Sequence, residues 1–279
     1  IWYAEGVELT AVDRAPGVPF ALQGYIGSYT KEAVFPSNRE VRYHVFSEFG
    51  VRLESFDDWP RDGDLAIADA ERVGLIGDLL AGVSFLHARG LPHLCLNEKT
   101  VRLGREVEGA DADGGAAGGP LRLRILGVGA GPSLNAANNT FQVPRSWAYT
   151  CPEVLSGLIV QSNLPALFAM DAWSVGTVTA MIIAGASESP QAARPEWYRL
   201  QFNERAAVLQ RIADRAERMN DFLFDLDQAS GGFLFRNGWL VELVINLLKT
   251  DPQERIPVRA AYAKLRENAP AYDAGARAA

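Results

Sequence analysis

The sequence predicts an α+β fold in which a short β-rich segment precedes a long helical one. Residues 20–29 and 41–48 are apolar, aromatic runs separated by turn-forming residues, a pattern typical of a strand pair. Most of the chain that follows has apolar residues at helical spacing, and no internal repeat is present. The clearest helical segments are residues 64–89, 170–184, 239–248 and 258–265.

Each predicted element follows from a local pattern. Residues 1–13 carry side chains at spacings of three and four that indicate the end of a helix, and the proline-rich stretch 15–19 stops it. Residues 64–89 predict a long amphipathic helix with one apolar stripe. The stripe consists of Leu75, Ile76, Leu79, Leu80, Val83 and Leu86.

The second half continues this pattern. Residues 104–119 are rich in Gly, Ala and Asp, which predicts a mobile insertion between two strands. Residues 170–184 are apolar nearly all round, as expected of a helix buried at the centre of the fold. Residues 196–221 alternate in charge on a helical pattern and predict a solvated face.

Composition excludes several classes of function. The chain has 279 residues, 48% of them hydrophobic, and a net charge of −7, which offers no basic surface for nucleic acid or for an anionic membrane. No apolar run approaches the roughly 20 residues of a transmembrane helix, so we expect no membrane span. Two cysteines, Cys95 and Cys151, indicate free thiols in a reducing intracellular compartment, and three histidines without a Cys-x-x-Cys pair make a zinc site improbable.

A series of short motifs occurs in a fixed order along the chain. They are VFSEFG at 45–50, FLHARGLPHLCLNEKTVRL at 85–103, LRLRILGVGA at 121–130, AYTCPEVLSG at 148–157, DAWSVG at 171–176 and KTDPQER at 249–255. In this order the motifs resemble the hinge, catalytic loop, metal-binding strand, activation-segment end, buried helix and late C-lobe turn of protein kinases. The resemblance covers nearly the whole chain.

The resemblance implies a protein kinase-like bilobal fold. Residues 1–50 would form a truncated N-lobe, containing the end of helix αC and its Glu5 followed by two strands. Residues 51–279 would form a mainly helical C-lobe with the insertion 104–119. The sequence begins after the point where the glycine-rich loop and the phosphate-binding lysine of the family would stand.

The residues that carry kinase chemistry are replaced in this register. His93 stands at the catalytic-loop His, Leu94 at the Arg and Cys95 at the catalytic Asp. Thr100 stands at the metal-binding Asn and Gly127 at the metal-binding Asp. Mg²⁺ prefers oxygen ligands, and a thiol, a hydroxyl and a glycine are a poor set for it. We therefore expect no catalysis, no cofactor, and no binding of ATP with magnesium.

Two rescues of catalysis are weaker readings. The first is that Glu98 or Lys99 supplies a missing charge, for which solvated surface charge is the simpler interpretation. The second is Cys95 as a nucleophile with His93 as its base, but a reactive Cys needs an electropositive, accessible setting.

The matched residues that remain are those that hold the family's fold. The resemblance implies a buried ion pair between Glu153 and Arg255, and a hydrogen bond from the catalytic-loop backbone to Asp171. It also implies that His93 packs inward, and Trp173 reads as a core residue. The sequence thus keeps packing residues and drops catalytic ones.

Three functions compete. The first is a catalytically inactive kinase-like domain, a pseudokinase, that acts as a scaffold or allosteric partner of other proteins. The second is a metal-independent nucleotide- or ligand-binding module using the hinge residues Glu48, Phe49 and Gly50. The third is an active kinase whose N-lobe precedes Ile1.

Overall fold

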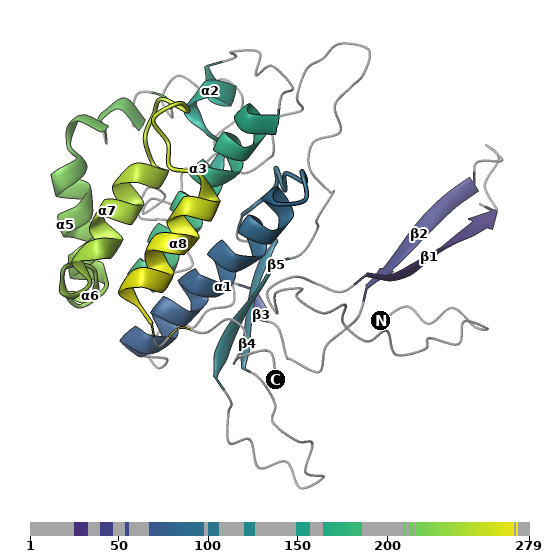
Figure 1. Ribbon diagram of the computed structural model, residues 1–279, viewed down its shortest axis with the longest axis horizontal. Coiled ribbons are helices and arrows are strands. Elements are labelled where there is room, and N and C mark those ends of the chain that lie inside the picture. The colour runs from purple at the N-terminus through teal and green to yellow at the C-terminus, as the bar shows by residue number, and fades with distance from the viewer. Residues whose placement is uncertain are drawn as a thin grey trace, which may run out of the picture.

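The computed structural model describes residues 25–32, 40–46, 54–55, 67–97, 100–105, 120–125, 149–156, 164–185, 209, 212–214, 216–270 and 272. This part of the chain is mainly helical, with two small antiparallel sheets (Figure 1). The strands are β1 (Tyr25–Glu32), β2 (Glu40–Phe46), β3 (Glu54–Ser55), β4 (Val101–Arg105) and β5 (Leu121–Ile125). The helices are α1 (Asp69–His87), α2 (Pro152–Leu155), α3 (Leu164–Ala184), α5 (Met219–Ala229), α6 (Phe233–Arg236), α7 (Gly238–Leu247) and α8 (Val258–Asn268).

Strands β1 and β2 form the first sheet, as an antiparallel pair running from Tyr25↔Phe46 to Glu32↔Glu40. The strand pair predicted from the aromatic runs is therefore confirmed, but the first strand lies further along the chain than expected. Pairing continues through polar residues such as Lys31 because backbone hydrogen bonds, and not side-chain polarity, define a ladder. The predicted helix end at 1–13 and the hinge residues 48–50 lie outside the described residues, and the domain boundary at residue 50 stays a prediction.

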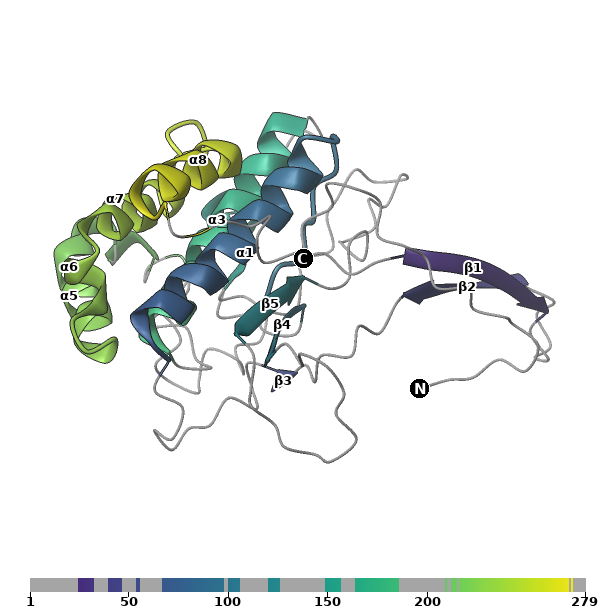
Figure 2. The same cartoon turned by 60° about the horizontal axis from the view of Figure 1, so that its bottom comes forward.

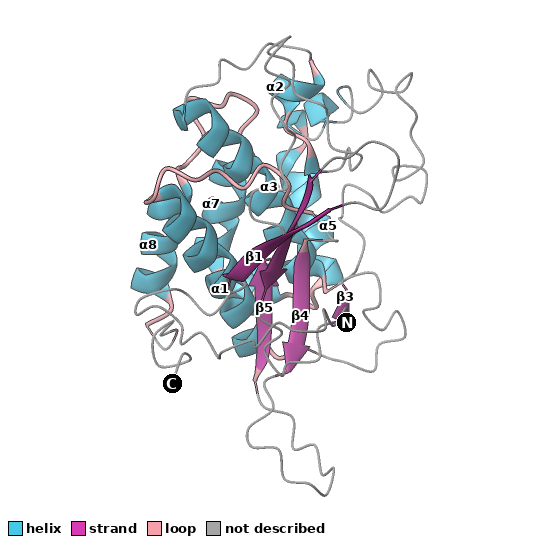
Figure 3. Ribbon diagram, turned by 90° about the vertical axis from the view of Figure 1, so that its right-hand side faces the viewer, coloured by secondary structure: helices cyan, strands magenta, loops and turns pink. Residues whose placement is uncertain are grey.

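The second sheet has the order β3-β4-β5 and lies along α1 (Figure 2). Arg105 pairs with Leu121 at the end of the β4–β5 ladder, so the insertion predicted at 104–119 begins two residues too early. Gly104 and Arg105 belong to the strand because their backbone completes this ladder. The remaining insertion residues lie outside the described part of the chain. In Figure 3, seen from the strand side, the helices lie behind and beside β4 and β5.

Helix α1 follows from its apolar spacing and from an acidic first turn, in which Glu71 Oε2 accepts the backbone N–H of Ala68 at 3.3 Å. It spans Asp69–His87 within the predicted range 64–89, and the whole predicted stripe is buried. The helix is not amphipathic as predicted, since every residue from Gly74 to Ser84 is buried. It packs against β5, α3 and α8, which together cover more than one face.

Helix α3 is the central helix of the described part, as its apolar sequence predicts. Trp173 and the residues from Val175 to Ile183 are buried, and α3 contacts α1, α5, α7 and α8. The expectation that no apolar run approaches transmembrane length is wrong. The 21 residues of α3 are long and apolar enough to cross a membrane, judged by length and composition alone. Of the 18 most apolar consecutive residues in α3, 72% are buried inside the fold. Length and composition do not distinguish a membrane span from such a core helix.

The last helices agree with the predicted segments to within a few residues. α7 and α8 occupy 238–247 and 258–268, against predictions of 239–248 and 258–265. The charged stretch 196–221 is described only in part, and α5 begins near its end, at Met219. The inner side of α5 is buried through Leu223 and Leu226.

Candidate functional site

The candidate site is the loop 93–97, which follows the end of α1. The helix stops at His87, and the chain reverses through Gly90, whose φ of 72° favours glycine. Leu94 then adopts a φ of 60°. No other non-glycine residue in the described part of the chain has a positive φ. A left-handed conformation costs an L-residue about 1–2 kcal/mol, so neighbouring contacts must hold this loop in place.

Asp171 of α3 provides those contacts. Its Oδ2 accepts the backbone N–H of His93 and its Oδ1 accepts that of Leu94, both at 2.7 Å. His87 Nε2 lies 2.9 Å from the same Oδ2, and the His87 ring stacks on Phe168 with centroids 4.1 Å apart. An ionised carboxylate only accepts hydrogen bonds, so one buried side chain orders the loop and the end of α1 together.

His93 is fully buried, and its Nδ1 accepts the backbone N–H of Cys95 at 3.3 Å. His93 Nδ1 is thereby occupied by the backbone N–H of Cys95 and not by its thiol. This geometry disfavours the pairing in which His93 would take the proton of the Cys95 thiol. The amide of Asn97 lies 3.7 Å from the Cys95 sulfur and donates to the Cys95 carbonyl at 3.1 Å.

Thr100 closes a tight turn instead of facing an open site. Its hydroxyl donates to the Cys95 carbonyl at 2.7 Å and accepts the backbone N–H of Asn97 at 2.9 Å. The Thr100 N–H in turn lies 3.3 Å from the Asn97 side-chain oxygen. A hydroxyl held in this way is poorly placed to bind a cation. Among the described residues no group of three or more His, Cys, Asp or Glu side chains could hold a metal ion.

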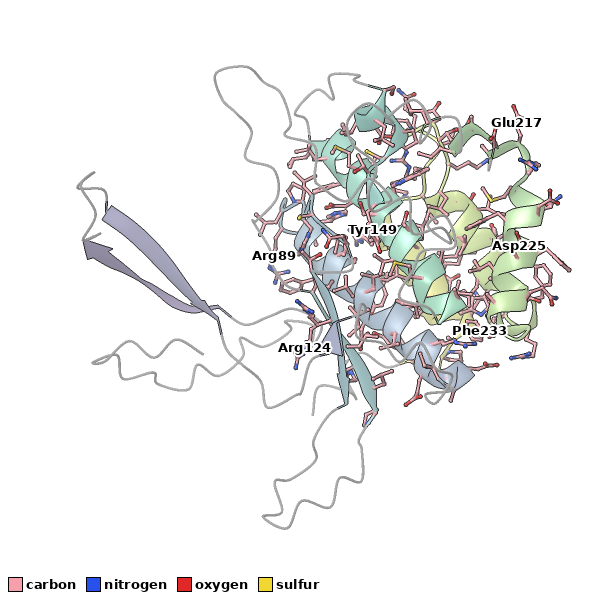
Figure 4. All side chains as sticks on the ribbon, turned by 180° about the vertical axis from the view of Figure 1, so that it is seen from behind. Arg89, Arg124, Tyr149, Glu217, Asp225 and Phe233 are labelled. Carbon is pink, nitrogen blue, oxygen red and sulfur yellow. The ribbon has the colours of Figure 1, made fainter. Side chains whose placement is uncertain are left out.

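A hollow of about 20 Å³ opens beside Cys95, large enough for about one water molecule. It is lined by Leu94, Cys95, Leu96, Asn97, Tyr149, Thr150 and Ser174. Tyr149, labelled in Figure 4, is buried, and its backbone carbonyl accepts the Ser174 hydroxyl at 3.0 Å. The structure thus brings residues 149–150 and Ser174 to the loop, which sequence reasoning did not include.

Glu153 and Arg255 form a buried ion pair, the contact that the sequence resemblance implied. Arg255 Nη1 and Nη2 lie 2.8 and 3.1 Å from the two carboxylate oxygens. The same guanidinium donates to the carbonyls of Ala169 at 2.6 Å and Lys249 at 3.0 Å, and lies 5.2 Å from the Trp173 ring centroid. This single side chain therefore joins α2, α3 and the turn after α7.

A second buried polar cluster was not anticipated. Asp78 of α1 accepts from Arg122 Nε at 3.1 Å and from the backbone N–H of Leu123 at 3.1 Å. The Tyr272 hydroxyl reaches the same carboxylate at 3.4 Å. Among the described strands β5 stands at the end of its sheet, and the Asp78 contacts fix it to α1. The sequence signal was an aspartate inside an apolar helical stretch and a strand in which arginine alternates with apolar residues, LRLRI.

Cys151 is almost entirely buried at the start of α2. Burial raises the pKa of its thiol well above the ordinary value, and the nearby Glu153 carboxylate adds to the rise. This thiol therefore stays protonated and unreactive in the folded chain. Cys95, in contrast, is partly exposed.

The other predicted site residues have no described position. Gly127 and the hinge residues Glu48, Phe49 and Gly50 lie outside the described part of the chain, as do Glu98 and Lys99. The structure brings together Asp171, His93, Cys95 and Thr100, and separately Glu153, Arg255 and Trp173.

Comparisons with known proteins find likenesses in structure but none in sequence. No family model matches the chain, and no curated protein matches it. Among solved structures, the chain is similar to the PknI kinase domain of Mycobacterium tuberculosis, a double mutant, with 14% identity and a TM-score of 0.46. The match covers 82% of this chain and 66% of that domain. A TM-score below 0.5 does not establish a shared fold.

Proposed function

We propose that this chain is a kinase-like domain that does not transfer phosphate and that acts as a scaffold or regulatory partner of other proteins. One observation carries the proposal: Asp171 holds loop 93–97 in a strained conformation, yet the residue held where an acid is needed is Cys95. Strained backbone concentrates at functional sites. The conformation of the loop is therefore that of a functional site, although the side chain at its centre is a thiol and not a carboxylate.

The chemistry of the loop supports the absence of phosphotransfer. Phosphoryl transfer needs a carboxylate to accept the substrate proton and oxygen ligands to hold Mg²⁺ on the phosphates. At the aligned positions Cys95 offers a thiol, and the Thr100 hydroxyl already bonds to the turn backbone. Each loss of such a group costs orders of magnitude in rate.

The contacts that keep the fold support a role as a binding partner. Arg255 retains a bidentate ion pair and two backbone carbonyls, and Asp171 retains both loop N–H groups. A chain that keeps such packing without the catalytic groups acts through its surface. The scaffold role itself comes from analogy with the resembled family, since fold alone does not determine function.

Phosphotransfer and nucleotide binding can be tested on the intact purified chain. With γ-labelled ATP and Mg²⁺ or Mn²⁺ we expect no turnover above a protein-free control, and no shift in Tm on adding ATP. Turnover that disappears in Cys95→Ala, but persists in Cys151→Ala, would overturn the proposal in favour of an active enzyme. A Tm shift by ATP that needs no metal would instead favour a metal-independent ligand-binding module.

A further inference from the structure

Helix α5 has two different faces. Leu223, Leu226 and Asp227 are buried on its inner side. Its outer side carries Asp221, Phe224, Asp225 and Gln228 at spacings of three and four, and all four are exposed. We call this stripe the Phe224 face. Figure 4 shows Asp225, and Glu217 just before the helix, pointing away from the helical core at its outer edge.

An exposed aromatic ring stands at the centre of this stripe. Phe224 is 54% exposed, and Phe235 on the neighbouring helix α6 is 51% exposed. The backbone N–H of Phe235 donates to Asp227 Oδ1 at 2.8 Å, which ties α6 to α5. Helices α5 and α6 therefore each present one exposed phenylalanine, and aromatic side chains are enriched at interaction sites. A partner that covers Phe224 buries the 54% of its surface that is still exposed, which is a favourable apolar contribution to binding.

The charge around Phe224 specifies the partner. α5 contains no Lys or Arg, and neither Asp221 nor Asp225 forms an ion pair with any residue that the structure describes. Some exposed acids elsewhere are paired, as Asp69 is with Arg236 at 2.9 Å and Glu242 is with Lys264, whereas Glu267 forms no ion pair with a described residue. Two unpaired carboxylates on either side of an apolar ring complement a basic surface with an apolar centre.

We infer that the Phe224 face docks a basic amphipathic helix of a partner protein. An apolar side chain of that helix covers Phe224, and its Lys or Arg side chains lie opposite Asp221 and Asp225. Helices of this kind bind through an apolar anchor with charged residues around it. The acidic charge of the face repels nucleic acid and anionic lipid, which carry the same sign.

The test uses the full chain and two fluorescent 18-residue helical peptides. One has Leu on one face and Lys on the other, and the second has Glu in place of every Lys. Anisotropy should show binding of the Lys peptide and none of the Glu peptide. Phe224→Ala and Asp221→Asn/Asp225→Asn should each weaken Lys-peptide binding about tenfold or more, and the double variant should also flatten its salt dependence. Glu254→Gln/Glu267→Gln, which removes equal charge from exposed positions elsewhere, should change binding less than twofold.

Three outcomes would overturn the inference. One is an affinity for the Lys peptide that all variants share, because it would reflect the net charge of the chain alone. Another is no binding of the Lys peptide at all. The last is sedimentation with phosphatidylserine–phosphatidylcholine vesicles that Phe224→Ala abolishes, because the face would then bind a membrane. Far-UV circular dichroism confirms that each variant is folded.

The inference deepens the partner-binding part of the proposed function and rests on it. The two fail separately, because the Phe224 face lies on α5 and the phosphotransfer test concerns loop 93–97. Turnover of ATP with intact peptide binding would overturn only the proposed lack of phosphotransfer. No turnover together with no binding of the Lys peptide would overturn only the docking surface.

Discussion

Replacing Asp171 with asparagine should loosen loop 93–97 more than any other single conservative change in the site. The carboxylate accepts two backbone N–H groups at 2.7 Å and lies 2.9 Å from His87 Nε2. An asparagine has one acceptor oxygen and an NH₂ group that cannot accept. Its best orientation places the oxygen at the Oδ2 position, near His93 and His87, and turns the NH₂ toward the Leu94 N–H.

The magnitude follows from the contacts that are lost. A buried N–H left without a partner costs about 1–3 kcal/mol, and the two remaining hydrogen bonds lose the strength that the negative charge adds. We expect Asp171→Asn to lower the free energy of unfolding by about 2–4 kcal/mol. The φ of 60° at Leu94 adds to the effect, because the loop relaxes once its restraint weakens.

Two measurements and one control test this reasoning. Urea unfolding reports the global loss, and hydrogen exchange of a peptide covering residues 91–97 reports the local one. A local loss of 2 kcal/mol corresponds to exchange about 30-fold faster at Leu94. The control is Asp227→Asn on α5, a buried aspartate whose Oδ1 accepts the backbone N–H of Phe235 at 2.8 Å and which can keep that bond as an amide. The reasoning is refuted if Asp171→Asn costs no more than Asp227→Asn, or if exchange at 93–94 is unchanged.

Three further predictions concern packing and the buried thiol. Gly77→Ala should destabilise the chain by about 1–3 kcal/mol, although alanine usually stabilises a helix, because the new Cβ would clash with the Tyr272 ring. Urea unfolding should show that this cost disappears in a Tyr272→Ala background. A Gly77→Ala variant more stable than the parent chain would contradict the reasoning. Thr179→Val should stabilise the chain by about 1 kcal/mol, because the buried Thr179 hydroxyl has no hydrogen-bond partner among the described residues. Thr177→Val is its matched control in thermal unfolding and should not stabilise, since that hydroxyl donates to the Trp173 carbonyl at 3.2 Å; equal gains would refute the explanation. The Cys151 thiol should resist a thiol reagent at pH 8 until the chain unfolds, while Cys95 reacts. Because the pKa of Cys151 is raised in the folded state, the unfolded chain releases this proton first, so stability should fall as the pH rises above the ordinary value of 9.0, and Cys151→Ala should make that fall shallower.

The local patterns of the sequence determined the elements and the packing of several of them. Apolar spacing predicted α7 and α8 to within a few residues, and an apolar circumference predicted that α3 is buried. The alignment of short motifs also predicted two tertiary contacts that the structure contains, that of Arg255 with Glu153 and that of Asp171 with the backbone of loop 93–97. Such patterns are readable because helix periodicity depends on neighbours three and four residues apart.

Tertiary structure decided what periodicity cannot express. It buried α1 on nearly every side, because β5, α3 and α8 all pack on it, whereas its sequence suggested one apolar stripe. It also decided the partners of Asp78, which lie 44 and 194 residues away at Arg122 and Tyr272. The sequence by itself determined which chemical groups this protein has, among them the thiol of Cys95 in loop 93–97. Only the fold decided which distant groups satisfy one another, because a buried charge is stable only where packing brings its partner within hydrogen-bond distance.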